Sequence, residues 1–308
     1  MAGTALNRAR GAAIILAMLI AALAAAVAAT VFADQQRWSR SVEHRRDQVQ
    51  AQALVMAGVQ WARQVLDDDA RHSDTDNLRE AWAIPLPPIP LDNGEIRGAI
   101  ADAQGRLNIN ALGDKGASAD IERQRLAALF VQRGGPAAAL DAIADWIDPD
   151  TIVRDAGAED AFYAAQTVPG LPPDAPVVRI AELASVRGVT AASLDAVAPF
   201  LCALPPGTPV NVNTAPPEVL ATIVDGLDGD RLAALIADRA SRPFGSISDF
   251  RARLPKGASL VSESALSVKS GFFYVSVEAR QGETIARARA LLRRSPGAPT
   301  AIAWQVVE

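Results

Sequence analysis

The chain has 308 residues, half of them apolar, and a formal net charge of −5 at pH 7. This length allows one long helix together with one or two folded domains. The acidic balance argues against nucleic acid and anionic membrane surfaces as partners. The chain holds only two histidines, His44 and His72, and one cysteine, Cys202. With no phosphate loop, HExxH pair or CxxC pair in the sequence, it lacks the groups on which most hydrolases and metalloenzymes depend, which argues against an enzyme.

The N-terminal segment predicts export. Arg8 and Arg10 precede an uncharged, almost wholly apolar run from Ala12 to Ala33. About 20 such residues, at about 1.5 Å each, span a bilayer core of about 30 Å. Because the arginines come first, the N-terminus is expected to stay in the cytoplasm. Three interpretations remain: a cleaved signal peptide, an uncleaved signal anchor, or a prepilin-type leader cut after Gly11 that leaves the apolar run on the mature protein.

The chain after the apolar run continues as a predicted helix. No proline occurs before Pro85, and Val42, Val49 and Met56 recur with the spacing of one helix face. The helix is therefore expected to run without a break to about Leu66. A membrane helix that continues directly into a helix outside the membrane is typical of pilins and pseudopilins, so the prepilin interpretation is favoured.

The rest of the chain changes from strand to helix and back. Pro85 to Pro90 ends the long helix, because proline cannot continue it. Glu95 to Ala103 and Arg106 to Asn110 are predicted to form a hairpin, and short helices follow up to about Leu266. Three further strands are predicted at Phe272 to Ala279, Thr284 to Arg294 and Ala301 to Val307. The sequence thus predicts an α+β fold: a long N-terminal helix packed on a small antiparallel sheet, with a large all-helical domain inserted.

Four carboxylates form the most notable polar pattern. Asp148 and Asp150 flank a proline, and Glu159 and Asp160 follow nine residues later. Hard oxygen ligands on a loop suit calcium, which tolerates irregular geometry. The alternative is a solvated acidic turn in which Asp148 and Asp150 cap backbone groups.

A second pattern, from Val210 to Phe250, resembles a helix-hairpin-helix module. In DNA-binding modules of this kind, hairpin amides hold a phosphate. Here the hairpin carries Asp225, Asp228 and Asp230, which would repel one. We expect the scaffold without nucleic-acid binding. An exported periplasmic binding module built on this scaffold is the alternative function.

Several motifs in order along the chain resemble minor pseudopilin K of the type II secretion system. They are Arg10-Gly11, Trp82-Ala83 with the proline run, Gln104 to Asn110, Asp145 to Asp150, Gly157 to Asp160, Leu201 to Pro205 and Val210 to Pro216. The resemblance implies a leader at 1–11, a membrane helix at 12–33, a pilin-like domain at 34–117 and 267–308, and an inserted helical domain at 118–266.

The resemblance also implies a function. It implies cleavage after Gly11 by the prepilin peptidase, N-methylation of Ala12, and calcium bound by Asp148, Asp150, Glu159 and Asp160. It implies a single-pass protein of the bacterial inner membrane with a periplasmic C-terminal domain. The expected partners are minor pseudopilins I and J, joined by H, with secreted substrates as further contacts. The expected role is non-enzymatic: to help initiate and cap the pseudopilus that exports folded proteins across the outer membrane.

Leu16 agrees with a place at the tip of the fibre. Most pseudopilins have glutamate at the fifth residue of the mature chain, where it pairs with the charged N-terminus of a neighbouring subunit. Counted from Ala12, that residue is Leu16. A carboxylate in the membrane is costly unless paired. A subunit with none above it has no such pair to make, so an apolar residue suits it.

Overall fold

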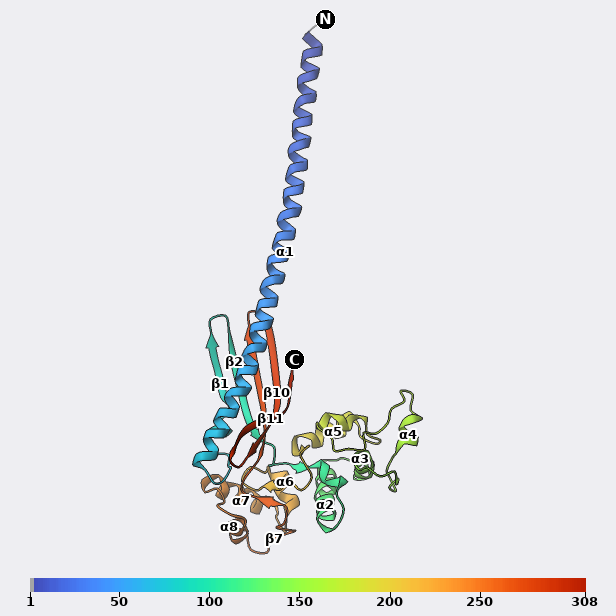
Figure 1. Ribbon diagram of the computed structural model, residues 1–308, viewed down its shortest axis with the longest axis vertical. Helices are drawn as coiled ribbons and strands as arrows, with labels where there is room; N and C mark the ends of the chain where they lie inside the picture. Colours follow the sequence, from blue (N-terminus) through green and yellow to red (C-terminus); the bar gives the residue numbers. More distant parts are fainter. Residues whose placement is uncertain (1–2) are drawn as a thin grey trace.

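The N-terminal helix dominates the shape of the molecule. The computed structural model describes the backbone of residues 3–308 and the side chains of residues 15–117 and 119–308. Its first element, α1 (Gly3–His72), is one helix of 70 residues, about 105 Å long at 1.5 Å per residue. Its first half projects away from the folded body (Figure 1). The part from Ile15 onward contains a window long and apolar enough to cross a membrane.

The second half of α1 packs on the sheet. The buried face is not the face of Val42, Val49 and Met56, whose spacing predicts the helix. Ala51, Val55, Val59, Ala62 and Leu66 are buried, with at most 2% of each residue exposed. Successive members are three or four residues apart, the spacing of a single helix stripe. The predicted helix is confirmed and extends past Leu66 to His72.

The apolar stripe that predicts the helix is exposed. Val42, Val49 and Met56 are 46%, 65% and 52% exposed. At 100° per residue, these side chains lie on one line of the helix, about a third of a turn away from the buried stripe. The helix therefore carries two apolar stripes, of which the sheet covers one.

The sheet has five antiparallel strands in the order β1-β2-β9-β10-β11. They are β1 (Leu86–Leu91), β2 (Gly94–Asp102), β9 (Phe272–Gln281), β10 (Thr284–Ser295) and β11 (Ala298–Val307). Helix α1 lies across one face of this sheet (Figure 1). The α+β fold and the three C-terminal strands are thereby confirmed.

The predicted hairpin is wrong. β2 pairs with β1 and β9, whereas β3 (Leu107–Asn108) leaves the sheet and pairs in parallel with β4 (Leu201–Cys202). The carboxylate of Asp102 accepts the Gln104 N–H at 2.7 Å, which turns the chain away at the end of β2. The hairpin in the structure is formed by β1 and β2, and β1 is a proline-rich strand at the edge of the sheet. Its prolines are tolerated there because an edge strand leaves alternate N–H groups unused.

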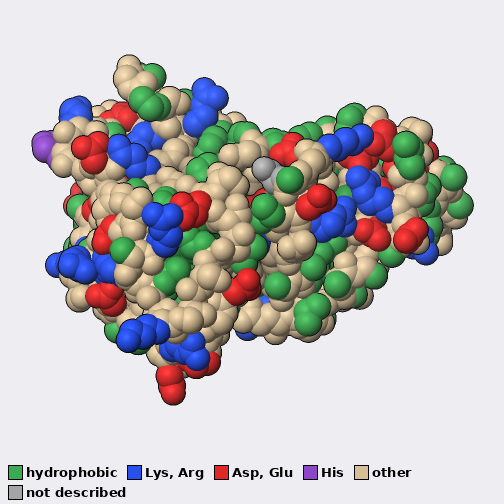
Figure 2. Space-filling model, turned by 90° about the horizontal axis from the view of Figure 1, so that it is seen from below, with side chains coloured by type: hydrophobic (Ala, Val, Ile, Leu, Met, Phe, Trp, Pro, Cys, Tyr) green, Lys and Arg blue, Asp and Glu red, His purple; other side chains and the backbone are tan. Residues whose placement is uncertain are grey.

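The segment between β2 and β9 folds into a helical unit with its own core. Its helices are α2 (Ala117–Gln132), α3 (Ala139–Ile147), α4 (Asp160–Ala164), α5 (Ala191–Val197), α6 (Pro217–Ile223), α7 (Gly229–Ser241) and α8 (Ile247–Ala252). Short strand pairs join β5 (Val210–Asn211) to β8 (Leu266–Ser267) and β6 (Val224–Asp225) to β7 (Ser259–Leu260). Leu107, Ile109 and Leu112 belong to this core. Seen along α1, the unit extends sideways from the body as a second lobe, with acidic and basic side chains mixed on both lobes (Figure 2).

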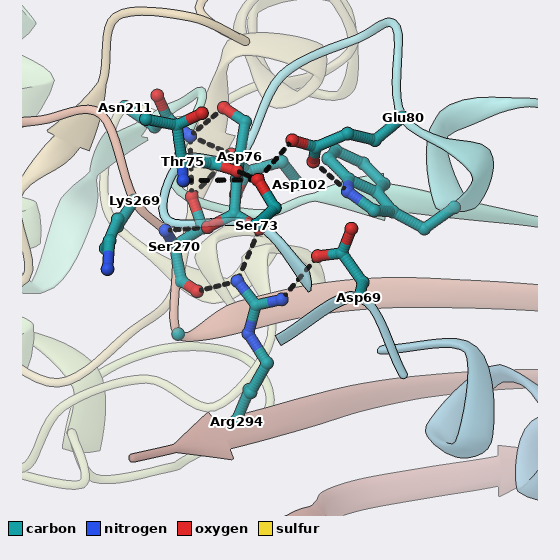
Figure 3. Close-up of polar contacts among 12 residues, drawn as sticks. Asp69, Ser73, Thr75, Asp76, Glu80, Asp102, Asn211, Lys269, Ser270 and Arg294 are labelled. Atoms are coloured by element: carbon teal, nitrogen blue, oxygen red, sulfur yellow. Dashed lines mark hydrogen bonds and ion pairs between the residues drawn. The ribbon is translucent and has the colours of Figure 1, made fainter. Parts of the chain in front are cut away.

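A buried carboxylate, Asp102, joins the sheet to the helical unit (Figure 3). Its Oδ2 accepts hydrogen bonds from Thr214 Oγ1 and Ser270 Oγ at 2.6 Å each, and from Asn211 Nδ2 at 3.0 Å. Asn211 ends β5, Thr214 lies in the turn after it, and Ser270 lies in the segment before β9. One side chain at the end of β2 therefore fixes where the helical unit leaves the sheet and where it returns.

Arg294 of β10 extends this junction to the end of α1. Its Nη1 lies 2.8 Å from Asp69 Oδ2, its Nη2 pairs with Asp76 Oδ1, and the same nitrogen donates to the Ser270 carbonyl at 2.8 Å. Asp76 in turn accepts the Ser270 N–H at 2.7 Å. Helix α1, the sheet and the helical unit thus meet at one hydrogen-bonded network.

We predict that Asp102→Ala destabilises the protein by about 2–4 kcal/mol at pH 7, because it leaves several buried donors unpaired. Burial raises the pKa of Asp102 to about 6. The folded state then binds a proton that the unfolded state, with a pKa near 3.9, gives up. The part of this stabilisation that depends on protonation of Asp102 is fully present below about pH 4 and is lost as the pH rises through about 6, whereas the hydrogen bonds to Asp102 still contribute at pH 7. The gap between wild type and Asp102→Ala should therefore widen as the pH falls from 7 to 4.

Urea unfolding of the full chain in detergent measures this gap. Ser276→Ala is the control, because Ser276 is exposed on β9, outside the junction. A gap that stays constant with pH would contradict the assignment of the titration to Asp102.

Candidate metal site on the helical unit

The end of one helix and the start of another place two carboxylates of the site. Helix α3 ends at its C-cap Asp148, and all but two of its residues are buried. Helix α4 begins after its N-cap Glu159, whose side chain caps no backbone N–H. Asp148 is 1% exposed and Glu159 is 6% exposed. The fold therefore buries the side chains of Asp148 and Glu159, although acidic side chains usually lie at the surface.

Three carboxylates converge at this point. Asp148, Asp150 and Glu159 each offer one oxygen, and these atoms all lie within 4.8 Å of one another. Both oxygens of Asp148 and Oε1 of Glu159 are buried with no hydrogen-bond donor among the described residues. Burial, and then the charges of Asp145 and Asp148, raise the pKa of Glu159 to about 7. Buried acceptors without donors fit a hard cation, which would satisfy their lone pairs and their charge together.

Arg154 supplies part of the counter-charge. Its Nη1 lies 2.5 Å from Asp145 Oδ1 and 2.6 Å from Asp148 Oδ2, the second contact without hydrogen-bond alignment. Gly157 packs against the carboxylate of Asp145. A Cβ at this position would lie 1.8 Å from Asp145 Oδ2, so a larger residue would not fit. Arg154 pairs with Asp145 and Asp148, and within the described residues no cation forms an ion pair with Glu159, so the group keeps a negative charge that a cation could neutralise.

The four residues proposed from sequence are not equivalent. Asp148 and Glu159 are buried, and Asp150 is half-buried, accepts the Ile152 N–H at 3.0 Å and pairs with Lys115 at 3.1 Å. Asp160 is exposed and lies outside the converging group. Sequence reasoning missed Asp145, which is fully buried beside them. Asp145 lies in the last turn of α3, three residues before the C-cap Asp148, and this short spacing is the signal that could have indicated it.

A second acidic group contrasts with this one. One oxygen each from Asp69, Asp76 and Glu80 also converge within 4.8 Å. Here the protein supplies the partners: Arg294 binds both aspartates, and Glu80 accepts from the indole of Trp82 at 2.6 Å (Figure 3). Its acids are already matched by donors, so this group fits a structural network.

The remaining predicted positions lie on α1 and on the α6–α7 connection. Gly11 and Ala12 fall on the backbone of α1, but their side chains lie outside the described residues. Leu16 is 60% exposed. In the hairpin, Asp228 caps α7 by accepting the Arg231 N–H at 2.9 Å. The carboxylate occupies the helix start where a DNA-binding hairpin would present its amides.

Known proteins match this chain along most of its length. Models of the type II secretion system protein K family match residues 105–206 and 210–269. Among relatives, type II secretion system protein K of Aeromonas hydrophila is 31% identical over 71% of this chain and 72% of its own length. The Pectobacterium carotovorum protein is 28% identical over 94% of each chain, and the Pseudomonas aeruginosa protein is 30% identical over 89% and 85%.

A solved structure agrees in fold. It is from the GspK-GspI-GspJ complex of enterotoxigenic Escherichia coli and matches with a TM-score of 0.76 and 24% identity, over 87% of this chain and 99% of that one. The relatives cover most of the chain, and the two family regions follow one another in order along it. The chain therefore belongs to the type II secretion system protein K family, a family of minor pseudopilins.

Proposed function

We propose that this chain is a non-enzymatic subunit at the tip of the pseudopilus, where it helps initiate and cap the fibre. The observation that carries the proposal is the position of the helical unit. Its helices α6, α7 and α8 lie beyond the end of α1 and of the sheet that is farthest from the membrane segment, while α4 and α5 extend to one side (Figure 1). A subunit stacked above would have to occupy that space, so the unit blocks growth in that direction.

The chemistry of the membrane segment supports the same place. From Ala12 to Ala33, α1 carries no ionisable side chain. Leu16 stands where a fibre-internal pseudopilin would use a carboxylate to pair with the next N-terminus. An unpaired carboxylate would cost several kcal/mol within a bilayer. Leucine avoids this cost in a subunit that has no neighbour above it.

The proposed partners are minor pseudopilins I and J, joined by H. The solved relative was crystallised with GspI and GspJ. The exposed stripe of Trp38, Val42, Val49 and Met56 offers an apolar line along which a neighbouring helix can pack. Secreted proteins are further proposed contacts as the fibre moves them through the outer membrane.

The proposed location is the bacterial inner membrane, with a cytoplasmic N-terminus and a periplasmic body. Arg8 and Arg10 before the apolar run favour this orientation. The prepilin peptidase would then cut after Gly11 on the cytoplasmic side and leave α1 nearly whole.

Calcium is the proposed ligand of the converging carboxylates. Asp148 and Glu159 would hold it with Asp150, and the ion would neutralise their charge and fix the loop between α3 and α4. Its preference for hard oxygen ligands and its tolerance of irregular loops fit this donor set.

We predict that the mature protein begins at N-methylated Ala12. Intact-mass and N-terminal peptide mass spectrometry of protein purified from membranes should find this end, and Gly11→Val should leave the precursor uncut. A mature end near Asp34 would instead support a cleaved signal peptide.

We predict that calcium raises the melting temperature of the full chain in detergent by about 4 °C over a chelator-treated sample, as expected for a ligand near 100 times its Kd. Asp148→Asn should lose most of this rise because it removes charge at the centre of the site. Asp160→Asn is the matched control, since Asp160 is exposed outside the group. Equal melts with calcium and chelator would count against a structural ion.

We predict that Val49→Glu reduces co-purification with pseudopilins I and J about tenfold or more, because it places a charge in the middle of the exposed stripe. Gln48→Glu is the matched control, since Gln48 is exposed about 100° around the helix. Equal recovery of I and J with both variants would show that the stripe is not the contact.

A further inference from the structure

The two edges of the sheet are built differently. β1, at one edge, carries Pro87, Pro88 and Pro90, which remove backbone donors and discourage a further strand. β11, at the other edge, has one proline, Pro299, near its start. No strand pairs with its outer side within the described part of the chain. The sheet is thus protected against strand addition on one side only.

The hydrogen-bond register identifies the free backbone groups of β11. Glu308 and Arg287 exchange both backbone hydrogen bonds, each at 2.8 Å. In an antiparallel pair these exchanges recur at every second residue, so Val306 and Trp304 bond to β10. The N–H and C=O groups of Gln305 therefore point away from the sheet.

Only part of this edge is open. At the start of β11, Thr300 donates its N–H to Asp67 Oδ1 and accepts from Arg63 Nε through its carbonyl, both at 2.7 Å. These two side chains of α1 occupy the edge there. The free edge is confined to the last residues of the strand, from Ala303 to Val307.

A groove lies beside the free edge, on the sheet face opposite α1. It has a volume of about 410 Å³ and lies between the outer face of the sheet and the helical unit at Arg179–Ala181. Trp304 and Val306 of β11 line it. The indole N–H of Trp304 is buried and has no acceptor among the described residues. A strand added to β11 would place alternate side chains next to this groove.

The groove is cationic although the chain is acidic. Arg106, Arg179 and Arg289 all line it. The half-buried guanidinium of Arg106 lies 5.2 Å from the centre of the Tyr274 ring, and no carboxylate within the described residues forms an ion pair with it. Arg289 pairs with Glu308 at 2.8 Å, and Arg179 lies 3.9 Å from Glu182. A guanidinium without an ion-pair partner on the groove wall presents charged donors to an anionic group.

We propose that β11 and this groove bind an extended acidic segment of another protein, which adds as a strand beside Ala303–Val307 and directs a carboxylate to Arg106. Backbone hydrogen bonds would supply affinity, and the cationic groove would select the sequence. The fibre neighbours proposed above pack on α1, whereas this surface lies on the other face of the sheet. The inference therefore concerns a partner outside the fibre and does not rest on the tip assignment.

Fluorescence anisotropy tests the proposal with the full chain in detergent. The probe is a labelled ten-residue peptide of alternating valine and threonine with two aspartates at its centre. Gln305→Pro should weaken binding at least tenfold, because proline removes the outward N–H without breaking a bond to β10. Gln305→Ala, the matched control, should bind as wild type. Arg106→Gln should also weaken binding about tenfold, with the melting temperature unchanged.

Changes to the peptide provide a test that leaves the protein intact, should Gln305→Pro fail to fold. N-methylation of alternate peptide residues should abolish binding, since it blocks the new ladder. A lysine version should not bind. The proposal is overturned if the acidic peptide does not bind, if the N-methylated or lysine peptide binds equally well, or if inorganic phosphate alone displaces the acidic peptide.

Discussion

The arrangement of the molecule depends on the carboxylate of Asp102, buried where three parts of the chain meet. The sheet under α1 and the helical unit have separate hydrophobic cores. Burial of apolar surface stabilises each core but has no direction, so it cannot by itself fix how the two parts meet. Directional hydrogen bonds from Thr214, Asn211 and Ser270 do so. Burial raises the pKa of Asp102 to about 6, so the charged carboxylate is disfavoured at this position, and the hydrogen bonds from its three donors offset part of that cost.

The acidic group between α3 and α4 differs from the Asp102 junction, because several of its buried carboxylate oxygens lack hydrogen-bond donors among the described residues. At the junction, every carboxylate has a donor from the protein. Between α3 and α4, Arg154 pairs with Asp145 and Asp148, whereas both oxygens of Asp148 and Oε1 of Glu159 have no hydrogen-bond donor among the described residues. The first group is complete as folded, whereas the second keeps buried oxygens without donors in the described part of the chain, which is why calcium is proposed there. Whether the buried carboxylates have donors from the protein therefore separates a structural network from a candidate binding site more clearly than the number of acidic residues does.

Local patterns and long-range contacts explain what the sequence could and could not predict. The unbroken α1 and the three C-terminal strands follow from residue spacing alone. The pairing of β2 with β9 joins segments about 180 residues apart, and no local signal specifies it, so a nearby strand was predicted instead. β1 was missed because its prolines normally end structure, and only an edge position makes them acceptable. At the candidate metal site, motif spacing found Asp148 and Glu159. Asp145 was missed because its burial depends on the packing of α3.

The two faces of the sheet have different consequences for assembly. One face is covered by α1, which also presents a second apolar stripe to neighbours. The other face ends at a strand whose outer backbone groups remain free. A free edge is a liability for aggregation, and the prolines of β1 show how this fold removes it. On β11 the blocking side chains of α1 reach only as far as Thr300. The residues of β11 that α1 does not block border the cationic groove. The edge that is open to strand addition and the arginines of the proposed binding site therefore lie at the same place on the surface.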